Sequence, residues 1–189
     1  MARLFGTNGV RGVVNRDMTV ELALDVGRAI GTFMMGRVAI ATDSRTSGDL
    51  MRSAVSAGMV SAGSSVVDLG MLPTPALQYY VKNSGVKGGV MITASHNPPQ
   101  FNGIKCVDHD GTEMPRVKEE VIERIYGERS FGLPEWRNVG TISHLEGVGA
   151  SYVNAIRRSV DRLKIEETKL NVVLDCANGA GSLTSPSLL

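Results

Sequence analysis

The segment Thr93-Ala94-Ser95-His96-Asn97-Pro98 places a hydroxyl, an imidazole and an amide in a loop that prolines stiffen. It directly follows an apolar run, 88–92, that predicts a buried strand, and α/β proteins place ligands at the carboxyl ends of strands. Neighbouring residues of an extended chain point to opposite sides, so Ser95 and His96 are not expected to pair as nucleophile and base. No Gly-x-Ser-x-Gly elbow surrounds Ser95, which argues against a serine hydrolase. The alternative is a turn whose side chains satisfy the loop backbone.

Two further segments hold groups that suit an anion such as phosphate. Phe5-Gly6-Thr7-Asn8-Gly9-Val10-Arg11-Gly12 places three glycines beside Arg11. Glycines let backbone N–H groups approach an anion closely, and an arginine can hold phosphate bidentately. The alternative for this segment is a flexible N-terminal arm. Lys105 starts a predicted return strand near Ser95, where it can act as a cation or a base, or lie solvated at a sheet edge.

Two loops with an aspartate share a common pattern, in which a short apolar run ends in Asp before small polar residues. Asp43-Ser44-Arg45-Thr46-Ser47-Gly48 leads into a predicted helix N-terminus, a geometry that favours anions. A capping loop with a surface arginine is the alternative. Asp175-Cys176-Ala177-Asn178-Gly179-Ala180-Gly181 imitates a dinucleotide fingerprint, but the third glycine is missing, which argues against such a site.

Apolar periodicity predicts the elements that position these loops. Helices are expected at 19–35, 48–62, 73–81 and 113–127, and strands at 38–41, 66–69, 88–92 and 102–107. Helices between strands indicate parallel crossovers, whereas the helix-free connection between the last two strands indicates an antiparallel pair. The predicted fold class is therefore α/β, a three-layer α/β/α domain over residues 1–145 with a mixed four-stranded sheet and irregular residues 1–18.

Residues 146–189 are expected to form a linker helix, 148–163, and the opening strand of a second, similar domain at 172–174. One strand and one helical turn cannot bury their apolar faces alone. We therefore expect the chain to be part of a longer polypeptide whose remaining domains lie on the C-terminal side.

Composition excludes several classes of partner. The 189 residues carry 20 Lys and Arg against 19 Asp and Glu, so no strongly basic face for nucleic acid is expected. No apolar run reaches the roughly 18–20 residues of a membrane helix, so no membrane partner is expected. Cys106 and Cys176 form no Cys-x-x-Cys pair and are expected to be buried thiols of a reducing, cytoplasmic compartment.

Taken together, the segments 5–12, 43–48 and 93–105 resemble, in this order, the N-terminal signatures of the α-D-phosphohexomutases. This family includes phosphoglucomutases, phosphomannomutases and phosphoglucosamine mutases. Residues 175–182 resemble the opening of the family's second domain, so the likeness covers the whole chain. The resemblance implies transfer of phosphate between the 1- and 6-positions of a hexose, through a phosphoserine and a bisphosphorylated sugar.

The resemblance also implies roles for individual residues. Ser95 would be the phosphoserine, and its phosphate would be a ligand of the cofactor Mg²⁺. Lys105 would be the general base, with His96 and Arg11 beside the reacting phosphate. The matched residues implied to bind substrate or phosphate are Thr7, Asn8, Arg45 and Asn97.

The chain departs from the family pattern in two ways. Asn8 stands where relatives often have Ser or Asp. The sequence also lacks the family's Asp-rich metal loop, its sugar-binding loop and its C-terminal phosphate-binding loop. We therefore expect the other Mg²⁺ ligands to lie elsewhere, together with the residues that choose among glucosamine, mannose and glucose phosphates. This chain alone is expected to be inactive as a mutase. The alternative hypothesis is a stand-alone phosphosugar-binding or regulatory module.

Overall fold

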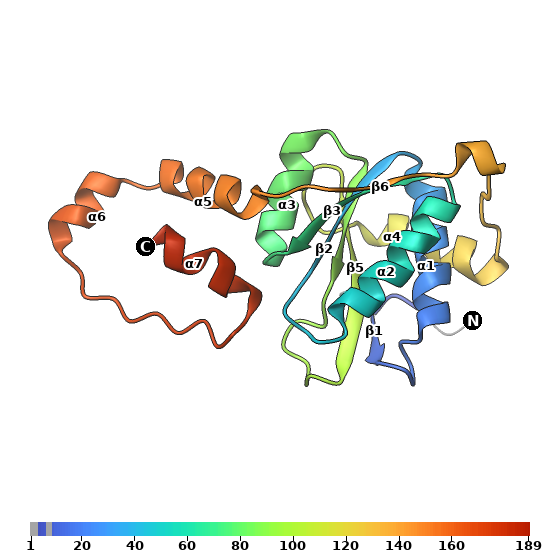
Figure 1. Ribbon diagram of the computed structural model, residues 1–189, viewed down its shortest axis with the longest axis horizontal. Coiled ribbons are helices and arrows are strands. Elements are labelled where there is room, and N and C mark those ends of the chain that lie inside the picture. The colour runs from blue at the N-terminus through green and yellow to red at the C-terminus, as the bar shows by residue number, and fades with distance from the viewer. Residues whose placement is uncertain (1–3, 7–8) are drawn as a thin grey trace.

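The computed structural model describes residues 4–6 and 9–189. Its centre is a six-stranded mixed sheet of order β1-β5-β4-β2-β3-β6, with helices on both faces (Figure 1). The four expected strands form as β2 (Arg37–Thr42), β3 (Ser65–Met71), β4 (Gly88–Ile92) and β5 (Phe101–Asp108). The α/β class and the mixed sheet are confirmed, and the number of strands is corrected from four to six.

The two additional strands lie in segments where no strand was expected. β1 (Val10–Val13) pairs antiparallel with β5, and β6 (Ile142–His144) pairs parallel with β3. Both are edge strands, and β6 is three exposed residues long. Neither was predicted by apolar periodicity, because an edge strand this short is defined by its pairing partner and not by burial.

The antiparallel pairing of the strands that flank the serine loop is confirmed. β4 and β5 run antiparallel from Gly88↔Asp108 to Ile92↔Ile104, while β2 runs parallel to both β3 and β4. This topology brings the carboxyl ends of β2 and β4 to one edge of the sheet, together with the start of β5.

Alternation along the strands explains the two helical layers. Val38 and Ile40 of β2 face a core formed with α1 (Val20–Met34), α2 (Gly48–Ser61) and α4 (Arg116–Glu128). Ala39 and Ala41 face a second core with α3 (Thr74–Ser84) and α5 (Val148–Ser159). Successive strand residues point to opposite faces, so both faces of β2 are buried.

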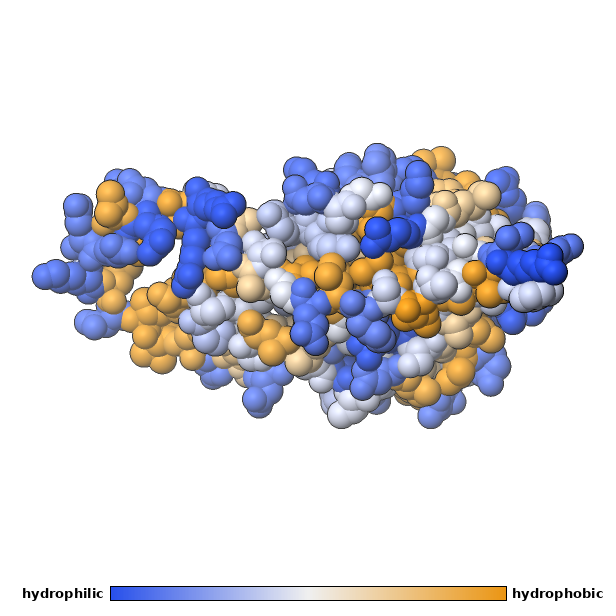
Figure 2. Space-filling view, turned by 45° about the horizontal axis from the view of Figure 1, so that its top comes forward, coloured by the Kyte–Doolittle hydropathy of each residue, from blue (hydrophilic) through white to orange (hydrophobic). Residues whose placement is uncertain are grey.

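The C-terminal residues differ from the expectation of an opening strand. The remaining elements are short: η1 (Trp136–Asn138), α6 (Arg162–Thr168), η2 (Ala180–Leu183) and α7 (Ser185–Leu188). No strand forms at 172–174, and Val173 is 98% exposed, because no strand of the described residues pairs with this segment. Figure 2 shows apolar side chains gathered on the C-terminal segment, where Leu163, Leu170 and Leu189 are exposed.

Within residues 4–6 and 9–189, none of the helices combines the length and apolar character needed to cross a membrane.

Candidate functional site

The serine loop presents the Ser95 hydroxyl to solvent through a left-handed backbone conformation. Ser95 has φ +56° and is exposed, whereas Thr93 and Ala94 just before it are buried. The Ser95 N–H donates to Thr93 Oγ1 at 2.9 Å, and the Asn97 N–H donates to the Ala94 carbonyl at 3.1 Å. A left-handed serine costs about 1–3 kcal/mol and persists only where its surroundings impose it. The loop is therefore built around the placement of this hydroxyl.

Arg45 imposes that conformation from beneath the loop. Its side chain is 11% exposed, and Nε donates to Asp43 Oδ2 at 3.2 Å. Its two terminal nitrogens donate at 2.7–2.9 Å to four backbone carbonyls of the loop, those of Ser95, Asn97, Pro98 and Phe101. A guanidinium has five N–H donors, so all are engaged. The direct phosphate contact expected of Arg45 would require it to release one of these carbonyls.

Asp43 and Thr93 complete the support, and sequence reasoning assigned a role to neither. Thr93 Oγ1 donates to Asp43 Oδ2 at 2.5 Å while accepting from the Ser95 N–H. Asp43 also accepts from the Arg45 backbone N–H at 3.1 Å. Asp43 follows β2 and Thr93 follows β4, and these two buried strands lie side by side. This placement is the sequence feature that could have indicated their contact. The chain of contacts from Arg45 to Ser95 is continuous.

Four of the expected residues, two pairs in contact, come together at the loop. Ser95 Oγ lies 3.4 Å from His96 Nδ1, and Arg11 Nη1 donates to Asn97 Oδ1 at 3.1 Å. The expectation that Ser95 and His96 point to opposite sides is wrong, because the left-handed turn replaces the extended backbone. Arg11 reaches the loop because it pairs with Gly103, where a Cβ would lie 2.9 Å from Arg11 Cγ and 2.6 Å from the Val10 carbonyl oxygen.

Lys105 lies on the same face of the sheet as Arg11, but its ammonium group is paired with a carboxylate. Lys105 is opposite Met91 in the β4–β5 pair, two residues from Gly103, so its side chain points to the face of Arg11. Its Nζ donates to the Glu113 carboxylate. Glu113 had not been recognised as a site residue, because nothing in the local pattern distinguishes it from other surface acids.

The N-terminal loop is anchored at both of its described ends, while Thr7 and Asn8 lie outside the described residues. The Phe5 N–H donates to Glu123 Oε1 at 2.6 Å, and Arg116 Nη2 donates to the same carboxylate at 2.6 Å. Burial raises the pKa of Glu123, but the Phe5 N–H and the Arg116 guanidinium together hold this pKa below its ordinary value. The ionised Glu123 of α4 therefore holds the segment that leads to Arg11.

A cavity of about 400 Å³ lies above the loop. The residues that line it are Asp43, Ser44, Arg45, Leu72, Pro73, Thr74, Met91, Thr93, Ser95, His96, Gly179 and Ala180. Hydroxyls, an imidazole and a guanidinium converge here, and such convergence is typical of ligand sites. No group of three or more His, Cys, Asp or Glu side chains in the described part of the chain has a geometry that could hold a metal ion. The Ser95 side chain alone does not offer the oxygens that Mg²⁺ requires.

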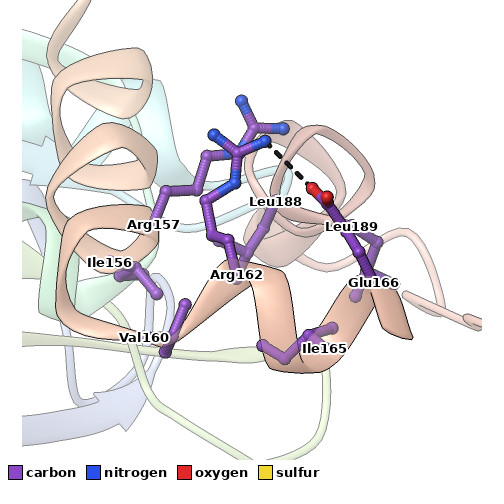
Figure 3. A pocket seen from close by; sticks show the side chains of 8 residues that line it. All are labelled: Ile156, Arg157, Val160, Arg162, Ile165, Glu166, Leu188 and Leu189. Atoms are coloured by element: carbon purple, nitrogen blue, oxygen red, sulfur yellow. Dashed lines mark hydrogen bonds and ion pairs between the residues drawn. The ribbon is translucent and has the colours of Figure 1, made fainter. Parts of the chain in front are cut away.

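A second hollow, of about 300 Å³, is formed by α5, α6 and α7 (Figure 3). Ile156, Val160 and Ile165 line it, and Arg162 Nη2 forms an ion pair with Glu166 Oε1 at 3.4 Å at its edge. No serine, histidine or cysteine of the described residues lines it. Of these two hollows, only the Ser95 cavity brings together the residues that the sequence singled out, and it is the candidate site.

The remaining histidines lie beside aspartates and do not line the Ser95 cavity, and Cys106 is buried. His144 Nδ1 lies 3.2 Å from Asp68 Oδ2, and His109 Nδ1 lies 3.0 Å from Asp108 Oδ1. Cys106 is buried, and burial, with a contribution from Glu119, strongly raises the pKa of its thiol. A protonated, buried thiol is unreactive.

Known proteins are similar to this chain in both sequence and fold. The sequence pattern described as "Phosphoglucomutase/phosphomannomutase, alpha/beta/alpha domain I" matches residues 2–132. The chain is 46% identical over 189 residues to the phosphoglucosamine/phosphogalactosamine mutase of Sulfurisphaera tokodaii, covering 98% of this chain and 42% of that protein. It is 40% identical over 195 residues to a phosphoglucomutase/phosphomannomutase of Thermococcus kodakarensis, covering 100% of this chain and 42% of the relative.

A solved structure supports the same conclusion. The crystal structure of a phosphoglucomutase/phosphomannomutase family protein from Burkholderia thailandensis superposes with a TM-score of 0.72 at 27% identity. The match covers 84% of this chain and 36% of that chain. The chain thus spans less than half the length of these relatives.

Proposed function

The chain belongs to the phosphoglucomutase/phosphomannomutase family, and we propose that it is the phosphoserine-bearing portion of a hexose-phosphate mutase, with Ser95 as the residue that carries the phosphate. The observation that carries this proposal is the serine loop itself. Ser95 is held in a left-handed conformation by Arg45, Asp43 and Thr93. In this conformation Ser95 lines the cavity that its loop shares with other polar side chains.

Phosphoryl transfer depends mainly on positioning and on neutralising charge. When Ser95 carries phosphate, Arg11, which already donates to the loop through Asn97, supplies a guanidinium beside it. Arg45 adds positive charge through space while it holds the loop carbonyls. Thr7, Asn8 and Asn97 are proposed to contact the phosphate or the sugar, as the family resemblance implies.

In the proposed transfer step, a sugar hydroxyl oxygen attacks the phosphorus of phosphorylated Ser95. A bond from phosphorus to that oxygen forms, and the bond from phosphorus to Ser95 Oγ breaks. Lys105 must first leave Glu113 and release a proton to water; its amine then takes the hydroxyl proton, and protonated His96 gives a proton to Ser95 Oγ. The 3.4 Å approach of His96 Nδ1 to Ser95 Oγ supports this path, whereas the Lys105–Glu113 ion pair favours the charged ammonium and has to open first.

Mg²⁺ is proposed as the cofactor, and it would neutralise charge on the transferring phosphate. Of the described residues only Ser95, through its phosphate, would hold it. Further ligands would have to come from outside the described residues, which contain no suitable cluster.

The proposed substrate class is a hexose phosphate. One relative is named for glucosamine and galactosamine phosphates and another for glucose and mannose phosphates, so the sugar stays open among these.

The test measures binding and transfer with the 189-residue chain. Glucosamine, mannose and glucose phosphates are titrated by calorimetry, and phosphoryl transfer from Ser95-phosphorylated protein to each sugar phosphate is followed with Mg²⁺ present. We expect binding of at least one sugar phosphate and a single transfer without turnover, because the full cycle is expected to need groups that other domains supply. Lys105→Ala should slow this transfer by about 10²–10⁴-fold, the usual contribution of a positioned general base.

Three outcomes decide between the hypotheses. Binding with transfer that depends on Lys105 supports the mutase proposal. Binding without any transfer overturns it in favour of a phosphosugar-binding module. Sustained interconversion of 1- and 6-phosphates by this chain alone would contradict the expectation that it needs further domains.

A further inference from the structure

The loop Asp175–Gly181 forms a wall of the Ser95 cavity, although its glycine pattern had argued only against a dinucleotide site. Gly179 and Ala180 line the same cavity as Ser95 and His96, from the opposite end of the sequence. Both are partly buried, unlike the exposed residues 171–175 before them. The loop is therefore part of the site's surroundings and is not simply a connection to α7.

Packing on the first domain holds this loop in place. Thr184, three residues after the loop, is 4% exposed. A small hollow between α3, α5 and α7 is lined by Pro73, Tyr152, Gly181 and Thr184, which places η2 and α7 against the start of α3. Pro73 also lines the Ser95 cavity, so the two contacts are continuous.

Internal hydrogen bonds give the loop a defined shape. Ala177 and Asn178 both have left-handed φ, at +46° and +58°. Asp175 Oδ1 accepts from the Ala177 N–H at 2.9 Å, and the Gly179 N–H donates to the Cys176 carbonyl at 2.8 Å. A loop closed by its own hydrogen bonds presents a fixed surface to the cavity.

The small size of the wall residues is not demanded by the fold. Gly179 has φ −73°, which any residue adopts, and a Cβ built there would come no nearer than 3.3 Å to another atom, the Cys176 carbonyl oxygen of its own loop. By contrast, a Cβ at Gly103 beneath the site would lie 2.6 Å from a backbone oxygen. A Cβ at Gly179 would thus be tight only against its own loop and would meet no other atom within 4 Å.

We propose that Gly179 and Ala180 are specificity-determining residues, whose small size sets the width of the cavity above Ser95 and admits a phosphorylated monosaccharide. The claim about cavity width is argued from the residues that line the cavity and from the packing of the loop. The claim that the ligand is a phosphorylated monosaccharide rests on the proposed function. A cavity of about 400 Å³ has room for a sugar ring and its phosphate. Added bulk at position 180 narrows this space without touching the polar groups of the serine loop.

The test uses a thiol in place of the hydroxyl. Ser95→Cys is made alone and combined with Ala180→Phe, and alkylation of the introduced thiol by a bulky maleimide and by the small reagent iodoacetamide is followed by peptide mass mapping. Ser182→Phe is the matched control, because Ser182 is exposed on the same short helix and does not line the cavity. Ala180→Val repeats the test with less added volume.

We expect Ala180→Phe to slow the bulky reagent several-fold while iodoacetamide reacts at nearly its original rate, and Ser182→Phe to change neither. With Ser95 intact, Ala180→Phe should weaken binding of a hexose phosphate and Ser182→Phe should not. Unchanged rates of alkylation by the maleimide in both Ala180 variants would overturn the proposal that residue 180 limits access to position 95. A second outcome is slower alkylation by the maleimide in the Ala180 variants, but no hexose phosphate binding by the unsubstituted chain. This outcome would support the position of Ala180 in the cavity wall and overturn the proposed function.

Discussion

Ser95 combines an exposed hydroxyl with a backbone conformation that serine rarely adopts, and the hydrogen bonds of its neighbours explain both. Its N–H is tied to Thr93, and its carbonyl is tied to Arg45. Arg45 itself is fixed by Asp43. Each of these supporting groups is mostly buried, so removing one leaves its buried partner without a hydrogen bond. The free-energy cost of that unpaired group exceeds the net contribution of the hydrogen bond itself.

This arrangement makes Thr93 the residue whose hydroxyl matters most to the loop. Thr93→Val keeps the shape but removes a donor to Asp43 and an acceptor for the Ser95 N–H. We expect a loss of about 1–3 kcal/mol in the free energy of unfolding, measured by urea denaturation, and faster hydrogen exchange of the Ser95 amide. Thr93→Ser, which retains the hydroxyl, should keep the Ser95 amide protected. Equal protection in both variants would show that the hydroxyl does not hold the loop.

Sequence reasoning at this scale located the residues but not all of their partners. Ser95, His96, Asn97 and Arg11 come together because they occupy one loop and the strand beside it. Arg45 lies at the serine loop as expected, but its N–H groups donate to loop carbonyls. No residue pattern distinguishes a buried arginine that holds a loop from one that binds phosphate. Glu113 was missed because its role depends on a contact with Lys105 that only the folded chain creates.

At the scale of elements, helix packing beneath the sheet depends on close backbone approach between α1 and α2. A Cβ built on Gly58 of α2 would lie 2.1 Å from the Leu24 carbonyl oxygen, and one on Gly27 would lie 2.3 Å from the Val55 carbonyl oxygen. These helices flank β2, whose carboxyl end leads to Asp43 and Arg45. Displacement of α2 would therefore reach the support of the serine loop.

Gly58→Ala should destabilise the chain by about 1–3 kcal/mol, because a backbone oxygen cannot move aside as a flexible side chain can. The matched control is Gly149→Ala in α5, where the nearest atom to an added Cβ is a side-chain carbon at 3.4 Å. This control should be neutral or stabilising by about 0.5–1 kcal/mol, since alanine favours a helix. Thermal and urea denaturation measure both, and equal effects would contradict the close packing of α1 and α2.

Asp108 links the end of β5 to α4 and predicts a dependence of stability on pH. Burial alone would raise the pKa of Asp108, but hydrogen bonds from Lys118, at 2.5 Å, and from His109 lower this pKa to about 2. A depressed folded-state pKa contributes stability that is fully present above the unfolded value of 3.8 and is lost as the pH falls toward 2. Because the Lys118 and His109 side chains are partly open to solvent, we expect about 1 kcal/mol.

The measurement is urea denaturation between pH 5 and pH 2. Asp108→Asn should reduce the loss of stability across this range, whereas Asp49→Asn, which removes an exposed carboxylate, should leave it unchanged. An equal loss in the parent chain and in Asp108→Asn would rule out Asp108 as a source of the acid sensitivity.

The elements that sequence periodicity located well are those with a buried face. β2, β4 and the helices beside them carry apolar residues on the buried side, and the helix-free connection correctly predicted the antiparallel β4–β5 pair. β6 was missed because its three residues are exposed, and β1 because four residues that include a glycine and an arginine are too short a run to show a pattern. The strand expected at 172–174 was wrong because an apolar run becomes a strand only beside a partner.

For the whole molecule, the chain belongs to the phosphoglucomutase/phosphomannomutase family, and the fold places the Ser95 cavity at the carboxyl ends of β2 and β4. The sheet brings together residues as distant in sequence as Arg11, Arg45 and Ser95. The C-terminal loop reaches the same cavity through Gly179 and Ala180. A site assembled from both ends of the chain could not be inferred from any one segment, although each segment had an interpretable pattern.

The central claim is that Ser95 carries phosphate, and phosphopeptide mapping after exposure to a hexose bisphosphate tests it most directly. The chain is incubated with glucose 1,6-bisphosphate and Mg²⁺, digested, and analysed by tandem mass spectrometry beside Ser95→Ala and Ser44→Ala, the latter removing a hydroxyl from the same cavity. We predict one added phosphoryl group, located on Ser95 in the parent chain and in Ser44→Ala, and none in Ser95→Ala. Phosphate on another residue, or an equal mass gain in Ser95→Ala, would contradict the account.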